Sequence, residues 1–137
     1  MTPPIDQSWS HCFACGPAEA HGLRLQYRFL STTSITASAT FDARFQGFDG
    51  VIHGGILATA LDDAMANIAC LQGERAMTVE LTARFKSPVR VGETVQVRAE
   101  VVRRKGRLME CRAWVEGEDG AIKVEGSGKF MIVGALG

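Results

Sequence analysis

Residues 54–72 read GGILATALDDAMANIACLQ, a helical pattern in a chain whose other patterned segments alternate with period two. Their apolar side chains recur three or four positions apart, as in an amphipathic helix: Ile56, Leu57, Ala60, Leu61, Ala64, Met65, Ile68 and Leu71. Gly73 follows as a stop signal. The pattern predicts one helix of about 19 residues, roughly 28 Å long.

On both sides of this helix, apolar and polar residues alternate, which is typical of half-buried strands. Two such runs precede the helix, at 23–29 and 35–41, and four follow it, at 79–85, 95–101, 109–115 and 122–132. Turn residues separate the later runs, namely Ser87-Pro88, Gly92-Glu93, Lys105-Gly106 and Glu118-Asp119-Gly120. The last four runs therefore predict an antiparallel meander.

The dimensions of these elements predict how they pack. A helix about 10 Å across covers only about two strands spaced at about 4.8 Å, so six strands must curl around it to share one core. The sequence predicts an α+β protein of the hot-dog type, with a curved antiparallel sheet of about six strands wrapped around one long central helix. We expect residues 1–137 to form a single domain, with 1–20 as an N-terminal extension or lead-in segment.

Composition argues against several classes of protein. Of the 137 residues 46% are hydrophobic, and 15 Lys and Arg balance 15 Asp and Glu. This balance argues against a nucleic-acid binder, and the apolar share argues against disorder. No run of about 18 apolar residues indicates a membrane span, and the first residues lack the pattern of a signal peptide. We therefore expect a cytoplasmic protein with neither nucleic-acid nor membrane partners.

The small number of cysteines fits a cytoplasmic protein, because a chain of this size builds its core without disulfides. Two of the four cysteines fall in apolar-periodic segments. The others, Cys12 and Cys15, form a C-x-x-C pair with His11 and His21 nearby. Such residues can hold zinc, but the second ligand pair of a typical zinc site is missing. The favoured interpretation is a packed turn without metal, and a zinc assay decides between the two.

The turn into the helix carries the most informative chemistry. It reads FQGFDGVIHGG over 45–55, and glycines around His53 let the backbone approach a ligand closely. The N–H groups at a helix start point outward with partial positive charge, so they can polarise a carbonyl or stabilise an oxyanion. The alternative is a tight loop under the sheet without a chemical role.

Asp62 and Asp63 are adjacent carboxylates about two turns into the helix, too far from its start to gain from the helix dipole. They fall on opposite margins of the apolar stripe, and periodicity does not choose between them. Asp63 has Thr59 and Asn67 four positions away, which suits a structural or solvent-facing role. Asp62 lies among small residues that allow a ligand or second subunit close, so its carboxylate is expected to act as a base or nucleophile.

Several of these features occur together in one known family. His53-Gly54-Gly55 is followed by an aspartate nine residues after the histidine, preceded by a Gln-Gly-x-x-Gly stretch, and followed by a Thr-bearing strand. With the opening Cys12-Phe13-x-Cys15-Gly16, this combination resembles the hot-dog-fold thioesterases of the phenylacetate-degradation (PaaI-like) type. The resemblance implies an acyl-CoA thioesterase, which hydrolyses a thioester to a carboxylic acid and free CoA and needs no metal or other cofactor.

The resemblance also implies roles for individual residues. Asp62 would be the catalytic carboxylate, acting as a general base on water or as a nucleophile, and the Gly55 N–H would polarise the thioester carbonyl. His53 would shape the turn, and Thr78 would help to position the water. Many relatives carry Asn or Gln in the loop before the histidine, where this chain has glycine, and Gln46 is the first substitute for that contact.

Further residues are expected to bind substrate. Arg103, Arg104 and Arg107 lie at one predicted hairpin turn. They either form a solvated turn or clamp the phosphates of CoA, which suit arginine. Gly54 and Asp63, next to the predicted catalytic residues, complete the predicted substrate-binding set.

The resemblance implies a homodimer with shared active sites, because the helix of one subunit and the loop of the other form each site in such folds. A dimer of dimers is the expected tetramer. An exposed sheet edge also favours pairing with a second copy. Two other functions stay open: a non-catalytic acyl-CoA binding module, and a hot-dog hydratase or dehydratase.

Overall fold

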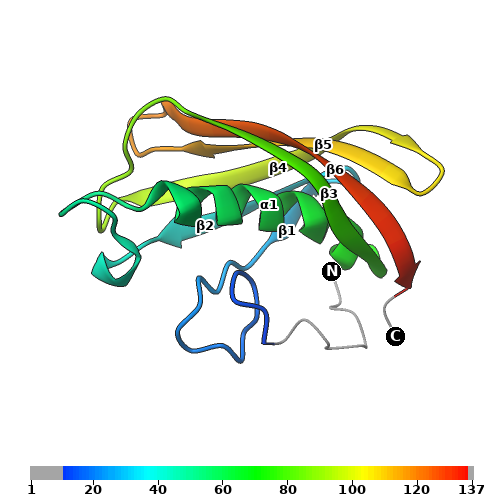
Figure 1. Ribbon diagram of the computed structural model, residues 1–137, viewed down its shortest axis with the longest axis horizontal. Helices are drawn as coiled ribbons and strands as arrows, with labels where there is room; N and C mark the ends of the chain where they lie inside the picture. Colours follow the sequence, from blue (N-terminus) through cyan, green and yellow to red (C-terminus); the bar gives the residue numbers. More distant parts are fainter. Residues whose placement is uncertain (1–10, 136–137) are drawn as a thin grey trace.

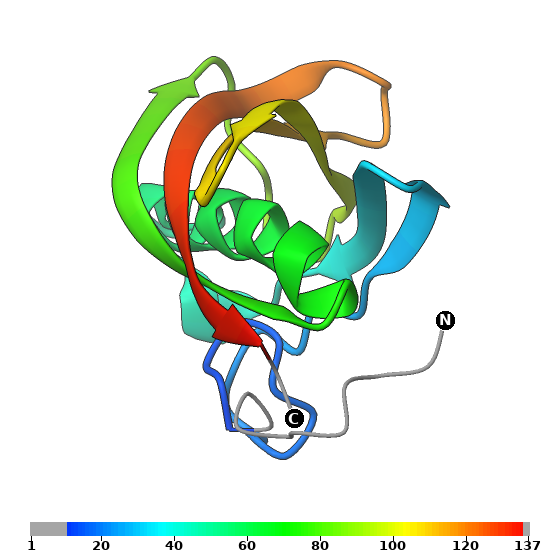
Figure 2. The same cartoon turned by 90° about the vertical axis from the view of Figure 1, so that its right-hand side faces the viewer.

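The computed structural model describes residues 11–135. Its elements are β1 (Arg28–Ser31), β2 (Ser34–Thr40), the 3₁₀-helix η1 (Ala43–Phe45), α1 (Gly54–Leu71), β3 (Glu74–Phe85), β4 (Thr94–Lys105), β5 (Leu108–Glu116) and β6 (Ile122–Ala135). The six strands form one antiparallel sheet that curls around α1 (Figures 1 and 2). The predicted α+β hot-dog fold is confirmed.

α1 matches the predicted helix because both of its ends carry local signals. His53 caps the start, where its Nδ1 accepts a hydrogen bond of 2.8 Å from the Gly55 N–H. Gly73, with φ of 83°, follows the C-cap and ends the helix. The apolar stripe between these ends is buried in the core: Leu57, Ala60, Leu61, Ala64, Met65, Ile68 and Ala69.

By length and composition alone, α1 is also long and apolar enough to span a membrane. Its 18 residues have a mean hydropathy of 1.2, and half of that segment is buried inside the protein. The core helix of a folded domain meets the same criteria, so the length and hydropathy of α1 do not by themselves indicate a membrane span.

The sheet order β1-β2-β4-β5-β6-β3 shows that the predicted four-strand meander is wrong at one strand. β4, β5 and β6 follow one another as expected, but β3 pairs with β6 at the far edge. The connection from β3 to β4 is attached to the turn before α1, through a Val51–Arg90 bridge and a 2.8 Å hydrogen bond from the Ile52 N–H to the Val89 carbonyl. Through this connection the chain crosses from the edge strand β3 to β4, instead of turning back in a hairpin.

The first predicted strand, at 23–29, is only partly correct, because β1 begins later. Arg24 adopts φ of 54°, which interrupts an extended run. The N–H groups of Leu23 and Leu25 instead donate to the carbonyls of Phe13 and Ala14, at 2.7 and 2.9 Å. These bonds hold the N-terminal loop beneath α1, on the side that the sheet leaves open (Figure 2). Of the predicted N-terminal segment 1–20, residues 1–10 lie outside the described part.

β3 exposes apolar side chains along its free edge. Met77, Val79 and Phe85 are 59%, 61% and 53% exposed. A bulge between Thr78 and Glu80 interrupts the predicted alternation of this strand. The molecule therefore presents an apolar edge strand beside the flank of α1 that carries Asp62.

Candidate active site

The predicted catalytic carboxylate lies on the side of α1 that faces β3. Thr78 donates a hydrogen bond of 2.7 Å from its Oγ1 to Oδ1 of Asp62. Asp62 is half-buried and Thr78 is exposed, so the carboxylate is oriented by the strand and still reached from solvent. A carboxylate in this position can accept a proton from water or attack an electrophilic carbon.

The turn before α1 places three further predicted residues around one pocket. Gln46, His53 and Gly55 line a surface pocket of about 380 Å³, together with Arg44, Phe45 and Ile56. The Gln46 side chain accepts a hydrogen bond of 3.1 Å from the Gly50 N–H and shapes the loop. Gly55 donates its N–H to His53 Nδ1 at 2.8 Å. The imidazole must therefore turn aside before this N–H can bind a substrate carbonyl.

Gly54 lies at the start of α1, close to β3. A Cβ atom added there would lie 3.4 Å from the Phe85 ring. This ordinary contact distance shows that the end of β3 lies against the helix start, which brings a hydrophobic ring beside the turn.

Gly55 and Asp62 lie on the same face of α1, because seven residues make nearly two turns. Along the axis that separation is about 10 Å. One thioester group is too small to contact both residues at once. Within a single protomer, the structure therefore does not bring together the two predicted catalytic groups.

Asp63 points into a different environment from Asp62. Its side chain is 8% exposed, and its Oδ2 accepts a hydrogen bond of 2.8 Å from the Tyr27 hydroxyl. Burial raises the pKa of Asp63 to about 6, an effect that the Tyr27 hydrogen bond partly offsets. Asn67 donates from its side-chain amide to the Asp63 carbonyl at 2.9 Å. Burial excludes the solvent-facing role for Asp63, and its contact with substrate stays a prediction.

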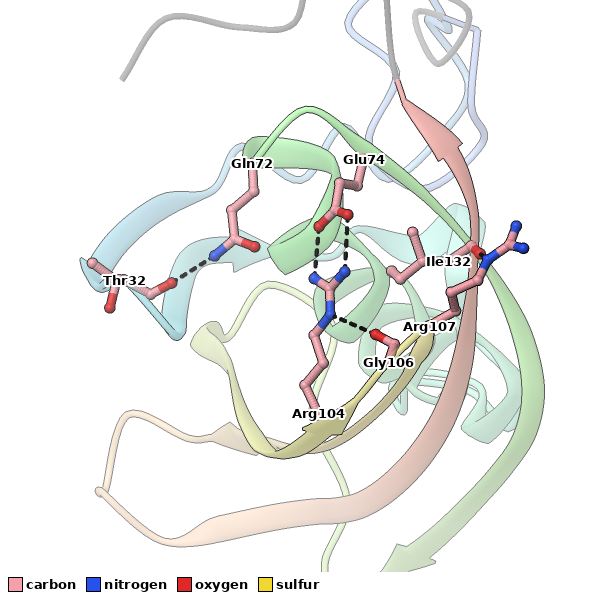
Figure 3. A network of polar contacts seen from close by, with 7 residues as sticks. All are labelled: Thr32, Gln72, Glu74, Arg104, Gly106, Arg107 and Ile132. Carbon is pink, nitrogen blue, oxygen red and sulfur yellow. Dashed lines mark hydrogen bonds and ion pairs between the residues drawn. The ribbon is translucent and has the colours of Figure 1, made fainter.

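The arginines of the β4–β5 turn are already bonded within the protein. Arg104 binds Glu74 through two hydrogen bonds of 2.7 and 2.9 Å (Figure 3). Arg103 pairs with Glu110 at 2.8 Å, and Arg107 donates to a backbone carbonyl of β6 at 3.0 Å. A CoA phosphate would compete with two carboxylates for these side chains, so their phosphate-binding role stays a prediction.

Sequence reasoning missed one group of residues, the polar contacts around Asp63. The alternating pattern treated Tyr27 as an apolar strand residue, whereas its hydroxyl reaches a carboxylate 36 positions away. In the sequence, only the C-x-x-C turn and the Asp63 carboxylate, which had no assigned chemical role, could have indicated this region.

The curled sheet and the central helix that carries Asp62 define a hot-dog protein with a carboxylate on its open edge. Residues 49–123 match the Thioesterase superfamily, and the chain belongs to that superfamily. Mouse acyl-coenzyme A thioesterase THEM5 is 28% identical over 88 residues, which cover 63% of this chain and 35% of THEM5. The chain thus spans about a third of the length of that relative.

Solved structures share the fold. A thioesterase superfamily protein aligns with a TM-score of 0.83 and 25% identity, over 95% of this chain and 70% of that one. The PaaI protein of E. coli, from the phenylacetic acid degradation operon, aligns with a TM-score of 0.78 and 20% identity, over 89% and 86% of the two chains. These similarities show the shared fold and do not single out the PaaI-like type.

A further similar structure is a hypothetical thioesterase of Streptococcus pneumoniae with coenzyme A. It aligns with a TM-score of 0.76 and 12% identity, over 82% of this chain and 88% of that one. Crystal structures also exist of two alanine mutants of that protein, one of an aspartate and one of a threonine 16 positions further on.

Proposed function

We propose that this protein is an acyl-CoA thioesterase. The observation that carries the proposal is the 2.7 Å hydrogen bond between Thr78 and Asp62, which holds a carboxylate of the core helix at the open edge of the sheet. Membership of the Thioesterase superfamily and the similarity to mouse acyl-coenzyme A thioesterase THEM5 support the substrate class.

In the general-base route, Asp62 takes a proton from water as the water oxygen attacks the thioester carbon. The tetrahedral intermediate then expels the CoA thiolate, which recovers the proton. In the nucleophilic route, the carboxylate attacks the carbon directly and the C–S bond breaks, so the CoA thiolate leaves and a mixed anhydride forms. Water then hydrolyses the anhydride, which regenerates the Asp62 carboxylate, releases the carboxylic acid and supplies the proton that the thiolate takes up. In both routes the N–H of Gly55, at the positive end of α1, stabilises the oxyanion once His53 has turned aside.

The separation of about 10 Å between Gly55 and Asp62 favours a site shared by two chains. β3 offers unpaired backbone groups and exposed apolar side chains, features that favour pairing with a second copy. If two β3 strands pair antiparallel about a two-fold axis, the two α1 helices also run antiparallel. Asp62 of one copy then approaches the helix start of the other. We propose this homodimer, with a dimer of dimers as the larger assembly.

Thiol release tests the proposal. Purified protein is incubated with a panel of aromatic, short-chain and medium-chain acyl-CoA esters, and free CoA is measured. We expect hydrolysis of at least one class. Thermal stabilisation by the esters without thiol release would instead indicate a binding module, and a change in enoyl absorbance without thiol would indicate a hydratase or dehydratase.

The cytoplasmic location and the absence of nucleic-acid and membrane partners stay predictions.

The change Thr78→Val is expected to lower kcat by about 10–100-fold, because hydrogen bonds to charged groups contribute about 1.5–3 kcal/mol. Valine keeps the shape of threonine and removes only the donor to Asp62. Thr82→Val, at an exposed position of the same strand, is the matched control and is expected to keep kcat. Equal rates for wild type and Thr78→Val would exclude a role for this hydrogen bond.

Arg103→Ala and Arg104→Ala test the predicted phosphate clamp. We expect a higher KM for acyl-CoA esters and an unchanged KM for the matching pantetheine thioesters, which lack the nucleotide phosphates. Arg112→Ala, at an exposed arginine of β5 that pairs with Glu100, is the control for loss of a surface charge. An equal rise of KM for both kinds of ester would contradict the clamp.

A further inference from the structure

The N-terminal loop brings two cysteines against the buried carboxylate of α1. The Sγ atoms of Cys12 and Cys15 and a carboxylate oxygen of Asp63 all lie within 4.8 Å of one another. Cys15 and Asp63 are 6% and 8% exposed, and Cys12 is half-buried. Thiolates and carboxylates are both ligands of zinc in proteins. Asp63, 51 positions after Cys12, therefore offers one further ligand group beside the C-x-x-C pair.

The backbone around the two cysteines is held in place on both sides. The Gly16 N–H donates to the Cys12 carbonyl at 2.8 Å and closes a tight turn that presents both thiols. The hydrogen bonds from Leu23 and Leu25 to the same loop fix it beneath α1. Ligand positions that are fixed in advance reduce the entropy cost of binding. These two thiols are therefore better placed to bind a metal than thiols on an unconstrained loop would be.

The carboxylate of Asp63 is oriented as a ligand would be. Its Oδ2 is held by the Tyr27 hydroxyl at 2.8 Å, and its Oδ1 faces the Cys12 sulfur at 3.8 Å. Metal-binding side chains are commonly held by such a second hydrogen-bonding partner. Tyr27 thus leaves one oxygen directed at the two thiols.

The Asp63 carboxylate has no ion pair among the residues that the structure describes. A buried carboxylate without a cationic partner is costly. A divalent cation bound by this carboxylate would supply that cationic partner.

We propose that Cys12, Cys15 and Asp63 bind one zinc ion. On binding, the two thiols lose their protons to solvent and become thiolates. Three protein ligands leave the fourth tetrahedral position to water. The ion ties the N-terminal loop to the middle of α1, one residue from Asp62, and has a structural role that does not depend on thioester hydrolysis.

The test begins with the wild-type protein, expressed without a histidine tag and desalted into a metal-free buffer. Elemental analysis is expected to find about one zinc per chain. Replacement with Co²⁺ is expected to give a thiolate-to-cobalt charge-transfer band. A chelator is expected to remove the metal and lower Tm. Neither bound zinc nor a thiolate band, before or after reconstitution, would overturn the proposal without any variant.

Variants then assign the ligands. Cys12→Ser, Cys15→Ser and Asp63→Ala are each expected to lower zinc affinity at least about 100-fold, and Tyr27→Phe about 10–100-fold. Cys70→Ala, a cysteine of α1 outside the cluster, is the control and is expected to keep the metal. Zinc that survives the double change of Cys12 and Cys15, or a Cys12–Cys15 disulfide in protein purified from the cytoplasm, would overturn the site.

Discussion

The change Asp62→Asn is expected to lower the rate of acyl-CoA hydrolysis by about 10²–10⁴-fold, the usual effect of removing a general base. The asparagine amide neither accepts a proton from water nor attacks a thioester. Its carbonyl oxygen can still accept the hydrogen bond that Thr78 gives to Oδ1 in the wild type, so the local geometry is expected to persist. Steady-state thiol release at saturating ester measures the effect.

Asp119→Asn is the matched control for this change. It makes the same chemical replacement in the exposed turn between β5 and β6 and is expected to keep the wild-type rate. Thermal unfolding of both variants shows whether the fold is kept. A fully active Asp62→Asn protein would remove Asp62 from the mechanism.

The second large effect is expected at the start of α1. Gly55→Pro removes the N–H that is proposed to stabilise the oxyanion, and proline is tolerated in the first turn of a helix. We expect a loss of about 10²–10³-fold in kcat. Gly55→Ala is the control because it keeps the N–H. Its methyl group would lie 3.0 Å from His53 Nδ1, at the tip of an exposed side chain that can move.

The two inactive variants together test whether each site is shared between chains. Asp62→Asn and Gly55→Pro chains are co-expressed with different tags, and the mixed dimer is isolated. In a shared arrangement, one of its two sites combines an intact Asp62 with an intact Gly55, so about half of the wild-type activity per dimer is expected. Co-expression of two differently tagged Asp62→Asn chains is the control and is expected to stay inactive.

A mixed dimer without activity would show that each site lies within one chain. In that case the proposed pairing of β3 strands would lose its catalytic purpose, while the effects of the single changes would still identify the residues. The zinc proposal is independent of this result, because its readouts are metal content and Tm.

Much of the fold was predictable because the relevant signals are local. The stripe from Ile56 to Leu71 repeats at the period of a helix, and Gly73 ends it, so α1 agrees with its prediction almost to the residue. The position of β3 was not predictable in this way. It depends on the pairing of β3 with β6, and pairing between distant segments leaves no periodic pattern in either one.

The same distinction between local signals and tertiary contacts applies to the candidate active site. By itself the sequence determined the glycine-rich turn at His53 and two adjacent carboxylates on one helix, because these are properties of neighbouring residues. The sequence and its family resemblance already favoured Asp62 over Asp63, and only the tertiary structure showed the partners of each carboxylate: Thr78 reaches Asp62 from the open edge strand, whereas Tyr27 and Cys12 enclose Asp63. The physical reason is that exposure and hydrogen bonding of a side chain depend on segments 16 to 51 positions away, which the curled sheet and the N-terminal loop bring against the helix.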